Sequence, residues 1–318
     1  MGNRLKPALR TKKQAKACTT NNSQGPVLMS QRIIAMLPTY NEAGNIRGLI
    51  EAILALGPDY QALVVDDDSP DGTWRIVGEM AAAHRGEQPG GESQPGRVHL
   101  VHRKHERGRG SAGVAGFVEA LRLGADLIVE MDADWSHHPR FIPALVGAAQ
   151  AAGGADAATG SWMTGAGADI VVGSQMSGAG ADVVVGSRMV AGGGEAGRTA
   201  LRKWITLGAS LYIRTVLGVH VRDCTSGFRV FRRGALEAID MAKLDSNGPA
   251  IVQEILMACK AQGCRFAEVP ILFEPRRAGQ STFSTRIMLA GLWSVLKFRF
   301  RDWKAVLKRE TKDKTPKA

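Results

Sequence analysis

Short apolar runs alternate with stretches of helical spacing in the first half of the chain. The apolar runs cover residues 32–37, 60–66, 97–102 and 126–132. Helical patterns are expected from Glu42, from Asp71, from about Ser111 and from about Pro139. Short continuous strands separated by helices are typical of a parallel sheet that helices cover on both faces. The sequence therefore predicts an α/β fold with a mostly parallel sheet.

A repeat of 13 residues follows these segments. Near copies occupy residues 165–177 and 178–190, and a weaker copy occupies 152–164. We interpret the repeat as a tandem duplication of one strand and its preceding turn. The last copy carries the β-branched run 183–185 and alone ends in an arginine, Arg188. We expect this copy to provide the strand of the sheet.

Polar residues stand where three of the predicted strands end. They are the segments PTYNE (38–42), DDDSPDG (66–72) and DADWSHH (132–138). Ligands of parallel α/β folds bind outside the carboxyl ends of the strands. Asp132 and Asp134 can place oxygen ligands around Mg²⁺ or Mn²⁺, which leaves its other positions to water and substrate phosphates. The sequence predicts a site for a metal-bound nucleotide diphosphate.

The charge distribution and the spacing of the Cys and His residues argue against a nucleic-acid-binding protein and against a zinc protein. The chain has 318 residues and a formal charge of +11, but residues 1–16 and 297–317 each carry a net +6, so the remainder is close to neutral. A nucleic-acid-binding core would carry its own positive face, so we expect no nucleic-acid partner. The four cysteines form no CxxC pair, and the adjacent His137 and His138 have no suitably spaced third ligand. No structural zinc site is expected.

Seven motifs in order carry a family resemblance. They are LPTYNE (37–42), VVDDDSPDGT (64–73), GRGSAGVAGF (108–117), EMDADWSHHP (130–139), GADVVVGSRMVAGG (180–193), DCTSGFRVF (223–231) and EVPILFEPRRAGQS (268–281). Together they span about residues 32–282. The sequence resembles glycosyltransferase family 2 proteins of the GT-A (Rossmann-like) fold, and within them most closely the polyprenol-phosphate (dolichol-phosphate) mannose synthases.

The resemblance implies roles for particular residues. The residues implied in donor binding are Pro38, Tyr40, Glu42 and Asp67, of which Asp67 would contact the nucleotide base. Asp132 and Asp134 would bind the metal, and Ser136 would be a weaker ligand at a position where the family often has Gln. Arg188 and Arg276 would contact phosphate, and Arg202 is a looser candidate for the same role. Glu254 would be an acidic residue on the acceptor side. Asp132, Asp134, Arg188 and Arg276 form the expected catalytic set.

The implied reaction is an inverting transfer of mannose from GDP-mannose to a polyprenyl phosphate, dependent on Mg²⁺ or Mn²⁺. Such an acceptor is already ionised near neutral pH, so no general base is needed. A UDP-glucose-dependent polyprenyl-phosphate glucosyltransferase, or another family 2 polysaccharide glycosyltransferase, remains an alternative. So does a non-catalytic nucleotide-sugar-binding or scaffold subunit, which is favoured by the tandem repeat, by Ser136, and by Glu106 and Thr282 where the family often has lysines. A sugar nucleotidyltransferase would need a glycine-rich basic loop near the first strand, which is missing here.

Three regions of the chain are distinguished by composition. Residues 1–30 are expected to be a disordered basic tail, residues 31–284 the catalytic domain, and residues 285–318 a basic amphipathic helix and tail. Helices that combine Leu, Trp and Phe with Lys and Arg lie at anionic membrane surfaces. No signal peptide and no transmembrane segment are expected. We therefore expect a peripheral protein on the cytoplasmic face of a membrane, with a membrane-anchoring subunit as a candidate partner.

Overall fold

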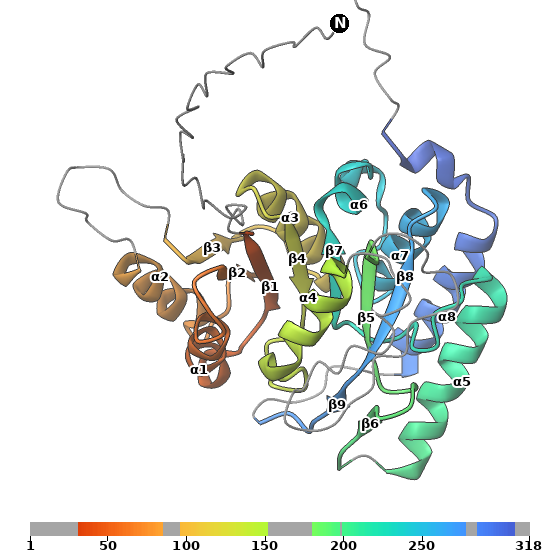
Figure 1. Cartoon of the computed structure of the whole chain (residues 1–318), viewed down its shortest axis with the longest axis horizontal. Coiled ribbons are helices and arrows are strands. Elements are labelled where there is room, and N and C mark those ends of the chain that lie inside the picture. Colours follow the sequence, from red (N-terminus) through yellow and green to blue (C-terminus); the bar gives the residue numbers. More distant parts are fainter. Residues whose placement is uncertain (1–30, 85–95, 152–179, 198, 278–284, 309–318) are drawn as a thin grey trace, which may run out of the picture. The chain divides into compact units, whose positions relative to one another are not determined.

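The computed structural model describes residues 31–84, 96–151, 180–197, 199–277 and 285–308. Figure 1 shows the elements, whose bounds are β1 Ile33–Thr39, α1 Ala43–Leu54, β2 Tyr60–Asp66, α2 Thr73–Ala83, β3 Val98–His102, α3 Arg109–Arg122, β4 Leu127–Glu130, η1 Pro139–Phe141, α4 Ile142–Gln150, β5 Val183–Ser187, β6 Gly194–Glu195, α5 Ala200–Leu217, β7 Arg229–Arg232, α6 Arg233–Glu237, η3 Met241–Lys243, α7 Ile251–Ala261, β8 Phe266–Pro270, β9 Leu272–Phe273, α8 Thr285–Arg299 and η4 Trp303–Val306. The predicted tail 1–30 and the first two copies of the repeat lie outside the described residues.

The main sheet has the strand order β3-β2-β1-β4-β7-β5-β8. All neighbours are parallel except β7, which runs antiparallel to both β4 and β5. The expected mostly parallel sheet with helices on both faces is confirmed. The last copy of the repeat forms β5, as expected, and the short strands β6 and β9 pair separately.

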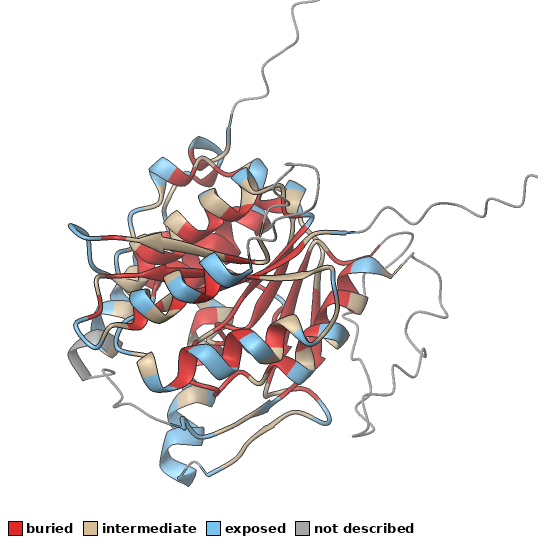
Figure 2. Cartoon of the chain, turned by 90° about the vertical axis from the view of Figure 1, so that its left-hand side faces the viewer, coloured by how far each residue is buried: buried red, intermediate tan, exposed pale blue. Residues whose placement is uncertain are grey.

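Alternation along the strands divides the core into two layers. On β1, Ile34 and Met36 face the layer that contains residues of α3, α5, α7 and α8, whereas Ile33, Ala35 and Leu37 face the layer with α1, α2 and α4. All five side chains are nearly or completely buried. Figure 2 shows the buried positions gathered on the strands and on the inward sides of the helices. The sheet is thus buried on both faces, which explains its continuous apolar runs.

The chain reverses its direction across the sheet between β1 and β4. It proceeds from β1 through β2 to β3 with α1 and α2 on one face, then returns to β4 through α3 on the other face. Gly116 allows α3 to approach the sheet closely, because a Cβ there would lie 2.6 Å from Cγ of Met36. Ligands of open α/β sheets bind at such a reversal. The carboxyl ends of β1 and β4 are therefore the place to look for a site.

Helices α5 and α8 pack against each other, and α8 also contacts α7. The Tyr212 hydroxyl of α5 donates a hydrogen bond of 3.1 Å to the Leu292 carbonyl of α8. None of the helices within the described ranges has both the length and the apolar character that crossing a bilayer requires.

Candidate active site

The loops after β1 and β2 are tied to each other by hydrogen bonds. Thr39 Oγ1 donates to Asp66 Oδ2 over 2.8 Å, and Asp66 also accepts from the backbone N–H and the hydroxyl of Ser69. The Glu42 backbone N–H then donates to Thr73 Oγ1 over 2.9 Å. These bonds fix Glu42 at the start of α1, beside the carboxyl end of β4.

The two aspartates of the DADWSHH segment differ in their surroundings. Asp134 is buried, and its Oδ1 accepts from the backbone N–H (3.0 Å) and the hydroxyl (2.5 Å) of Ser136. The Asp132 side chain is one-third exposed. Trp135, directly after Asp134, has a φ of +68°, a left-handed conformation that is costly for a bulky residue. The loop is therefore held in one conformation, and Ser136, expected as a weak metal ligand, orients Asp134.

An arginine pairs with each of these carboxylates. Arg109 Nη2 lies 2.8 Å from Asp132 Oδ1, and Arg276 Nε lies 2.8 Å from Asp134 Oδ2. Burial tends to raise the pKa of Asp132, but the positive charges of Arg109 and Arg276 outweigh it, and the pKa is lowered. Asp132 is thus an anion at neutral pH, with cations positioned beside it.

His137 holds the backbone of this loop. Its Nδ1 accepts a hydrogen bond of 3.1 Å from the Asp132 N–H, and its ring stacks on Phe228. Burial lowers the pKa of His137, although Asp132 opposes the change. The imidazole is therefore neutral and acts as an acceptor, in agreement with the expectation that a histidine orients the loop.

Arg188 lies at the same edge of the sheet, and its guanidinium is fully engaged. Nε and Nη2 bind the two carboxylate oxygens of Asp223 at 2.7 Å each, and Nη2 also donates to Thr225 Oγ1. Nη1 lies 3.1 Å from Glu195 Oε1. Both Arg188 and Asp223 are buried. The arginine expected to bind phosphate is thus part of a buried ion-pair network beside Asp132.

Asp67 lies on the other side of the site, after β2. Its Oδ2 accepts from the Gly108 N–H over 2.8 Å, and its Oδ1 forms an ion pair of 3.1 Å with Arg103. Burial raises the pKa of Asp67, with the Gly108 hydrogen bond and Arg103 acting in the opposite direction. Pro38 lies in β1, and the exposed Tyr40 ring stands under the Arg107 guanidinium.

The donor groups fit a hard divalent cation. Asp132 and Asp134 offer carboxylate oxygens on one loop, and Glu42 is close enough that their charges help to raise its pKa, after burial as the main cause. Mg²⁺ and Mn²⁺ use one or two carboxylates and complete their shells with water and phosphate. Within the described residues no group of three or more acidic, His or Cys side chains is arranged around one point.

Two predicted residues lie away from this cluster. Arg202 is on the exposed first turn of α5, and its guanidinium makes no hydrogen bond or ion pair with a described residue. Glu254, expected on the acceptor side, is fully buried in α7 and pairs with Arg301. Both of its oxygens accept hydrogen bonds from protein groups, so it is not open to a ligand.

Three residues of the site were not predicted as such. They are Arg103, Arg109 and Asp223. Arg109 and Asp223 stand inside the GRG and DCTSG motifs, so the motifs were a signal for them. Their partners lie 23 and 35 residues away in the sequence, and only the fold brings each pair together.

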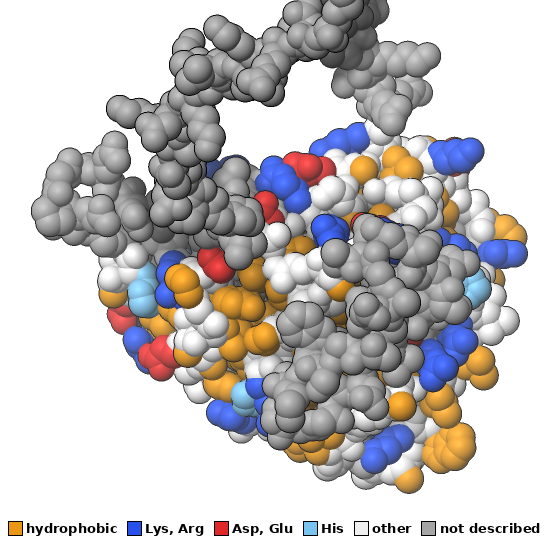
Figure 3. Space-filling view, in the orientation of Figure 1, with side chains coloured by type: hydrophobic (Ala, Val, Ile, Leu, Met, Phe, Trp, Pro, Cys, Tyr) orange, Lys and Arg blue, Asp and Glu red, His pale blue; other side chains and the backbone are white. Residues whose placement is uncertain are grey.

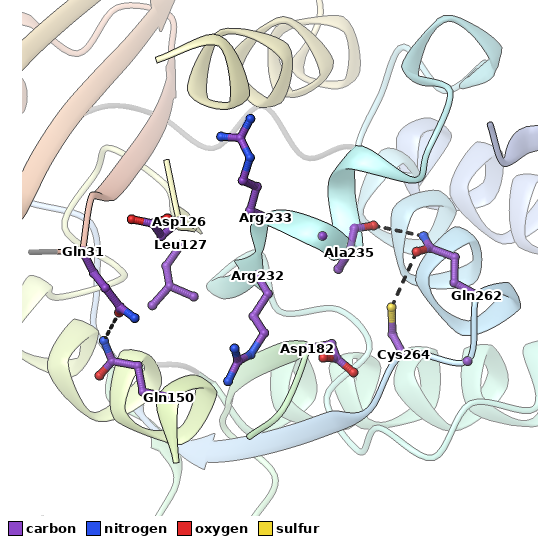
Figure 4. A pocket seen from close by; sticks show the side chains of 12 residues that line it. Gln31, Asp126, Leu127, Gln150, Asp182, Arg232, Arg233, Ala235, Gln262 and Cys264 are labelled. Atoms are coloured by element: carbon purple, nitrogen blue, oxygen red, sulfur yellow. Dashed lines mark hydrogen bonds between the residues drawn. The ribbon is translucent and has the colours of Figure 1, made fainter. Parts of the chain in front are cut away.

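A cavity of about 430 Å³ lies at the opposite edge of the sheet, where β4, β5 and β8 begin (Figure 4). Its wall includes Arg232, whose guanidinium donates to the carbonyls of Ala181 and Ala149. Asp182 is held by a bidentate ion pair with Arg265. These charged groups are already satisfied within the protein, so the cavity carries no comparable chemistry.

The sheet, the carboxylate pair at the reversal point and the surrounding arginines define the GT-A class of α/β folds. A crystal structure described as a mycobacterial protein matches at a TM-score of 0.53 and 17% identity, covering 84% of this chain and 75% of that one. Glucosyl-3-phosphoglycerate synthase from Mycobacterium tuberculosis, in complex with Mn²⁺, UDP-glucose and glycerol 3-phosphate, matches at 0.50 and 18% identity, covering 84% and 78%.

Sequence relatives give the family. The model of the glycosyl transferase family 2 domain matches residues 35–170. Polyprenol monophosphomannose synthase of Mycolicibacterium smegmatis is 33% identical over 86% of this chain and 88% of its own length. Undecaprenyl-phosphate mannosyltransferase of Micrococcus luteus is 33% identical (84% and 98%), and dolichol-phosphate mannosyltransferase of Pyrococcus furiosus is 29% identical (88% and 67%). The chain belongs to glycosyltransferase family 2 and is a glycosyltransferase.

Proposed function

We propose that the protein transfers mannose from GDP-mannose to a polyprenyl phosphate with inversion at the anomeric carbon, in a reaction that requires Mg²⁺ or Mn²⁺. The observation that carries the proposal is the pair Asp132 and Asp134 at the reversal point of the sheet, in a chain whose relatives are named for mannosyl transfer to polyprenyl phosphates. Asp132, Asp134 and the substrate diphosphate would hold the cation, which would neutralise the leaving diphosphate.

The proposed step needs little acid–base chemistry from the protein. A phosphate oxygen of the acceptor attacks the anomeric carbon, and the bond from that carbon to the diphosphate oxygen breaks, so that GDP leaves with the electron pair. The acceptor brings no proton that must be removed. The neighbouring histidine fits this scheme, because His137 is buried and its Nδ1 already accepts the Asp132 N–H. The residues would mainly orient the substrates and balance charge.

Arg276 is the best candidate for a phosphate contact. Its side chain is 41% exposed, and its ion pair with Asp134 is made through Nε, so the exposed part of the guanidinium can donate to an anion. Arg109, which pairs with Asp132, is the second candidate. When a cation binds the two aspartates, both guanidinium groups lose part of their attraction to the carboxylates. We propose that they then bind phosphate oxygens of the substrates.

A radiolabel transfer assay tests this function. Purified protein is given GDP-mannose or UDP-glucose, polyprenyl phosphate, and Mg²⁺ or Mn²⁺. Lipid-linked mannose from GDP-mannose is expected, with activity lost in Asp134→Asn and retained in Glu79→Gln, whose carboxylate is exposed on α2. Lipid product formed only with UDP-glucose would show that UDP-glucose, and not GDP-mannose, is the donor. The absence of lipid product with either donor would refute the proposal.

We also propose that α5 and α8 place the enzyme on an anionic membrane surface. The outward sides of the two packed helices expose large apolar side chains: Leu201, Trp204, Ile205, Leu207 and Leu211 on α5, and Leu289, Trp293 and Leu296 on α8, followed by Phe300. The opposite sides pack in the core, through Ile213 of α5 and Val295 of α8 among others. Figure 3 shows apolar and basic side chains next to each other at the lower right, over α5.

The charges beside this apolar surface favour a lipid bilayer as its partner. Arg202 and Lys203 on α5, and Lys297 and Arg299 on α8, are exposed next to the apolar side chains. An interfacial helix has an apolar face flanked by basic residues, and each Lys or Arg near an anionic surface adds about 1 kcal/mol of attraction. A lipid acceptor would then be bound by a domain that already lies at the bilayer surface.

Vesicle binding tests this surface. Trp204→Ser and Trp293→Ser should each weaken binding to phosphatidylcholine vesicles containing phosphatidylglycerol by about tenfold, because each removes an aromatic side chain that would be buried in the bilayer when the protein binds. Val118→Ser is the matched control, because Val118 is an exposed apolar residue of α3. Equal binding of all variants, or binding that does not depend on the anionic lipid, would contradict this assignment.

A further inference from the structure

Glu254 joins the segment after α8 to a loop beside the active site. Its Oε1 and Oε2 each accept a backbone hydrogen bond of 2.9 Å, from Asp245 and Ser246 respectively. Arg301, two residues after α8, forms an ion pair with Glu254 Oε1 and another of 3.2 Å with Asp245 Oδ2. Arg301 also donates to the Lys243 carbonyl. The carboxylate of Glu254 is fully buried.

The loop held in this way packs backbone against backbone on the start of α3. The Gly110 N–H donates to the Asn247 carbonyl over 3.0 Å. A Cβ at Gly110 would lie 1.8 Å from the Ser246 carbonyl oxygen, and a Cβ at Gly108 would lie 2.8 Å from that of Asn247. Gly108 also has a φ of +140°. The two glycines of the GRG motif are thus required by contact with residues 246–247.

The start of α3 carries two contacts to the active site. The Gly108 N–H donates to Asp67, the residue expected at the nucleotide base, and Arg109 pairs with Asp132 of the carboxylate pair. Displacement of the loop 245–247 would release Gly110 and shift both contacts. Contacts run without a gap from Arg301 through Glu254 and this loop to both sides of the donor site.

We propose that Glu254, with Arg301, is a positioning residue that fixes the GRG segment for nucleotide-sugar binding and acts on neither the acceptor nor a proton. Its role in donor binding rests on the proposed function. The geometry explains why an acidic residue stands here: a carboxylate can accept from two backbone N–H groups and an arginine at the same time. It also makes the segment that follows the membrane-facing helix a part of the donor site's support.

Donor and acceptor parameters separate this role from an acceptor-side one. In Glu254→Gln and Arg301→Met, the Kd for GDP with Mn²⁺, measured by calorimetry, should rise about tenfold, as expected for the loss of a charge-assisted hydrogen bond that supports the site. The KM for polyprenyl phosphate should not change. Arg301→Lys, which keeps the charge, should restore part of the affinity. Glu237→Gln is the control, because Glu237 forms an exposed ion pair with Arg233 on α6.

Amide hydrogen exchange gives a readout that needs no substrate. The Gly110 amide and its neighbours in residues 108–112 should exchange faster in Glu254→Gln and Arg301→Met than in the wild type or in Glu237→Gln. Unchanged exchange there would overturn the proposal, as would a raised KM for the acceptor with an unchanged Kd for GDP. If the wild-type protein binds no GDP, the proposed donor fails, and the exchange rates still decide whether Glu254 positions this segment.

Discussion

Replacing Asp223 with Asn should destabilise the protein strongly. Asp223 is fully buried and accepts hydrogen bonds from the Arg188 backbone N–H (3.0 Å) and from Arg188 Nε and Nη2 (2.7 Å each). An Asn presents one oxygen and would turn an NH₂ group toward the guanidinium. Breaking a buried ion pair costs about 3–5 kcal/mol. Because Glu195 still faces Arg188, we expect the lower end, about 3 kcal/mol.

Chemical and thermal denaturation measure this change. A loss of about 3 kcal/mol corresponds to a fall in Tm of roughly 6–12 °C for a domain of this size. Asp240→Asn, at a partly exposed ion pair with Lys243, should change the free energy of unfolding by less than about 1 kcal/mol. A change of less than about 1 kcal/mol in Asp223→Asn as well would refute the buried network. Arg188 would then be free to bind phosphate directly.

The pH dependence of that stability follows from the pKa of Asp223. Burial alone would raise it, but the hydrogen bonds and charge of Arg188 outweigh burial and lower it. A carboxyl group with a lowered folded pKa stabilises the protein above its unfolded pKa of about 3.9, and this stabilisation is lost as the pH falls through the folded value. Asp223→Asn should therefore show a shallower loss of stability in acid than the wild type.

Three further predictions concern packing, ionisation and the metal. Gly116→Ala should destabilise the protein by about 1–3 kcal/mol in urea denaturation, because the new Cβ would lie 2.6 Å from Met36. Gly113→Ala is the control and should be neutral or stabilising, because no atom lies within 4 Å of its new Cβ. Equal effects of the two substitutions would contradict the close helix–sheet contact. Burial lowers the pKa of His99 in the folded protein. The free energy of unfolding should therefore fall as the pH drops through the unfolded pKa of about 6.5, where the unfolded chain takes up the proton first. In melting experiments from pH 8 to about pH 5, His99→Gln should remove this part of the pH dependence. GDP with Mn²⁺ at a hundred times Kd should stabilise the wild type against unfolding by about 2.7 kcal/mol. EDTA or Asp132→Asn should remove this stabilisation, and the control Glu79→Gln should retain it. Full stabilisation in the presence of EDTA would refute a metal-bound donor.

The sequence predicted the sheet well where hydrophobicity alone decides. Residues 60–66 form β2 with the predicted bounds, and the Val183–Val185 run of the last repeat forms β5. The antiparallel β7 was not predicted, because the residues of its motif contain nothing that specifies direction. Direction depends on the long connection through α5 that brings the chain back between β4 and β5.

The candidate site was predicted in its acidic half and incompletely in its basic half. Asp132, Asp134 and Glu42 could be placed together, because strand ends of a parallel sheet share an edge. The partners of the arginines could not, since Arg188 meets Asp223 and Glu195 only through the fold. Glu254 shows the same limit: its motif position indicated the acceptor side, but both its oxygens bind protein groups next to Arg301.

The configuration of the lipid product tests the proposed function most directly. Purified protein is incubated with GDP-mannose, a short polyprenyl phosphate and Mn²⁺, and the product is identified by mass spectrometry and by NMR at the anomeric carbon. Direct attack by the acceptor phosphate at the site of Asp132 and Asp134 predicts a mannosyl phosphate lipid with the anomeric configuration opposite to that of the donor. Retained configuration, release of free mannose, or no lipid product although the protein is folded would contradict this mechanism.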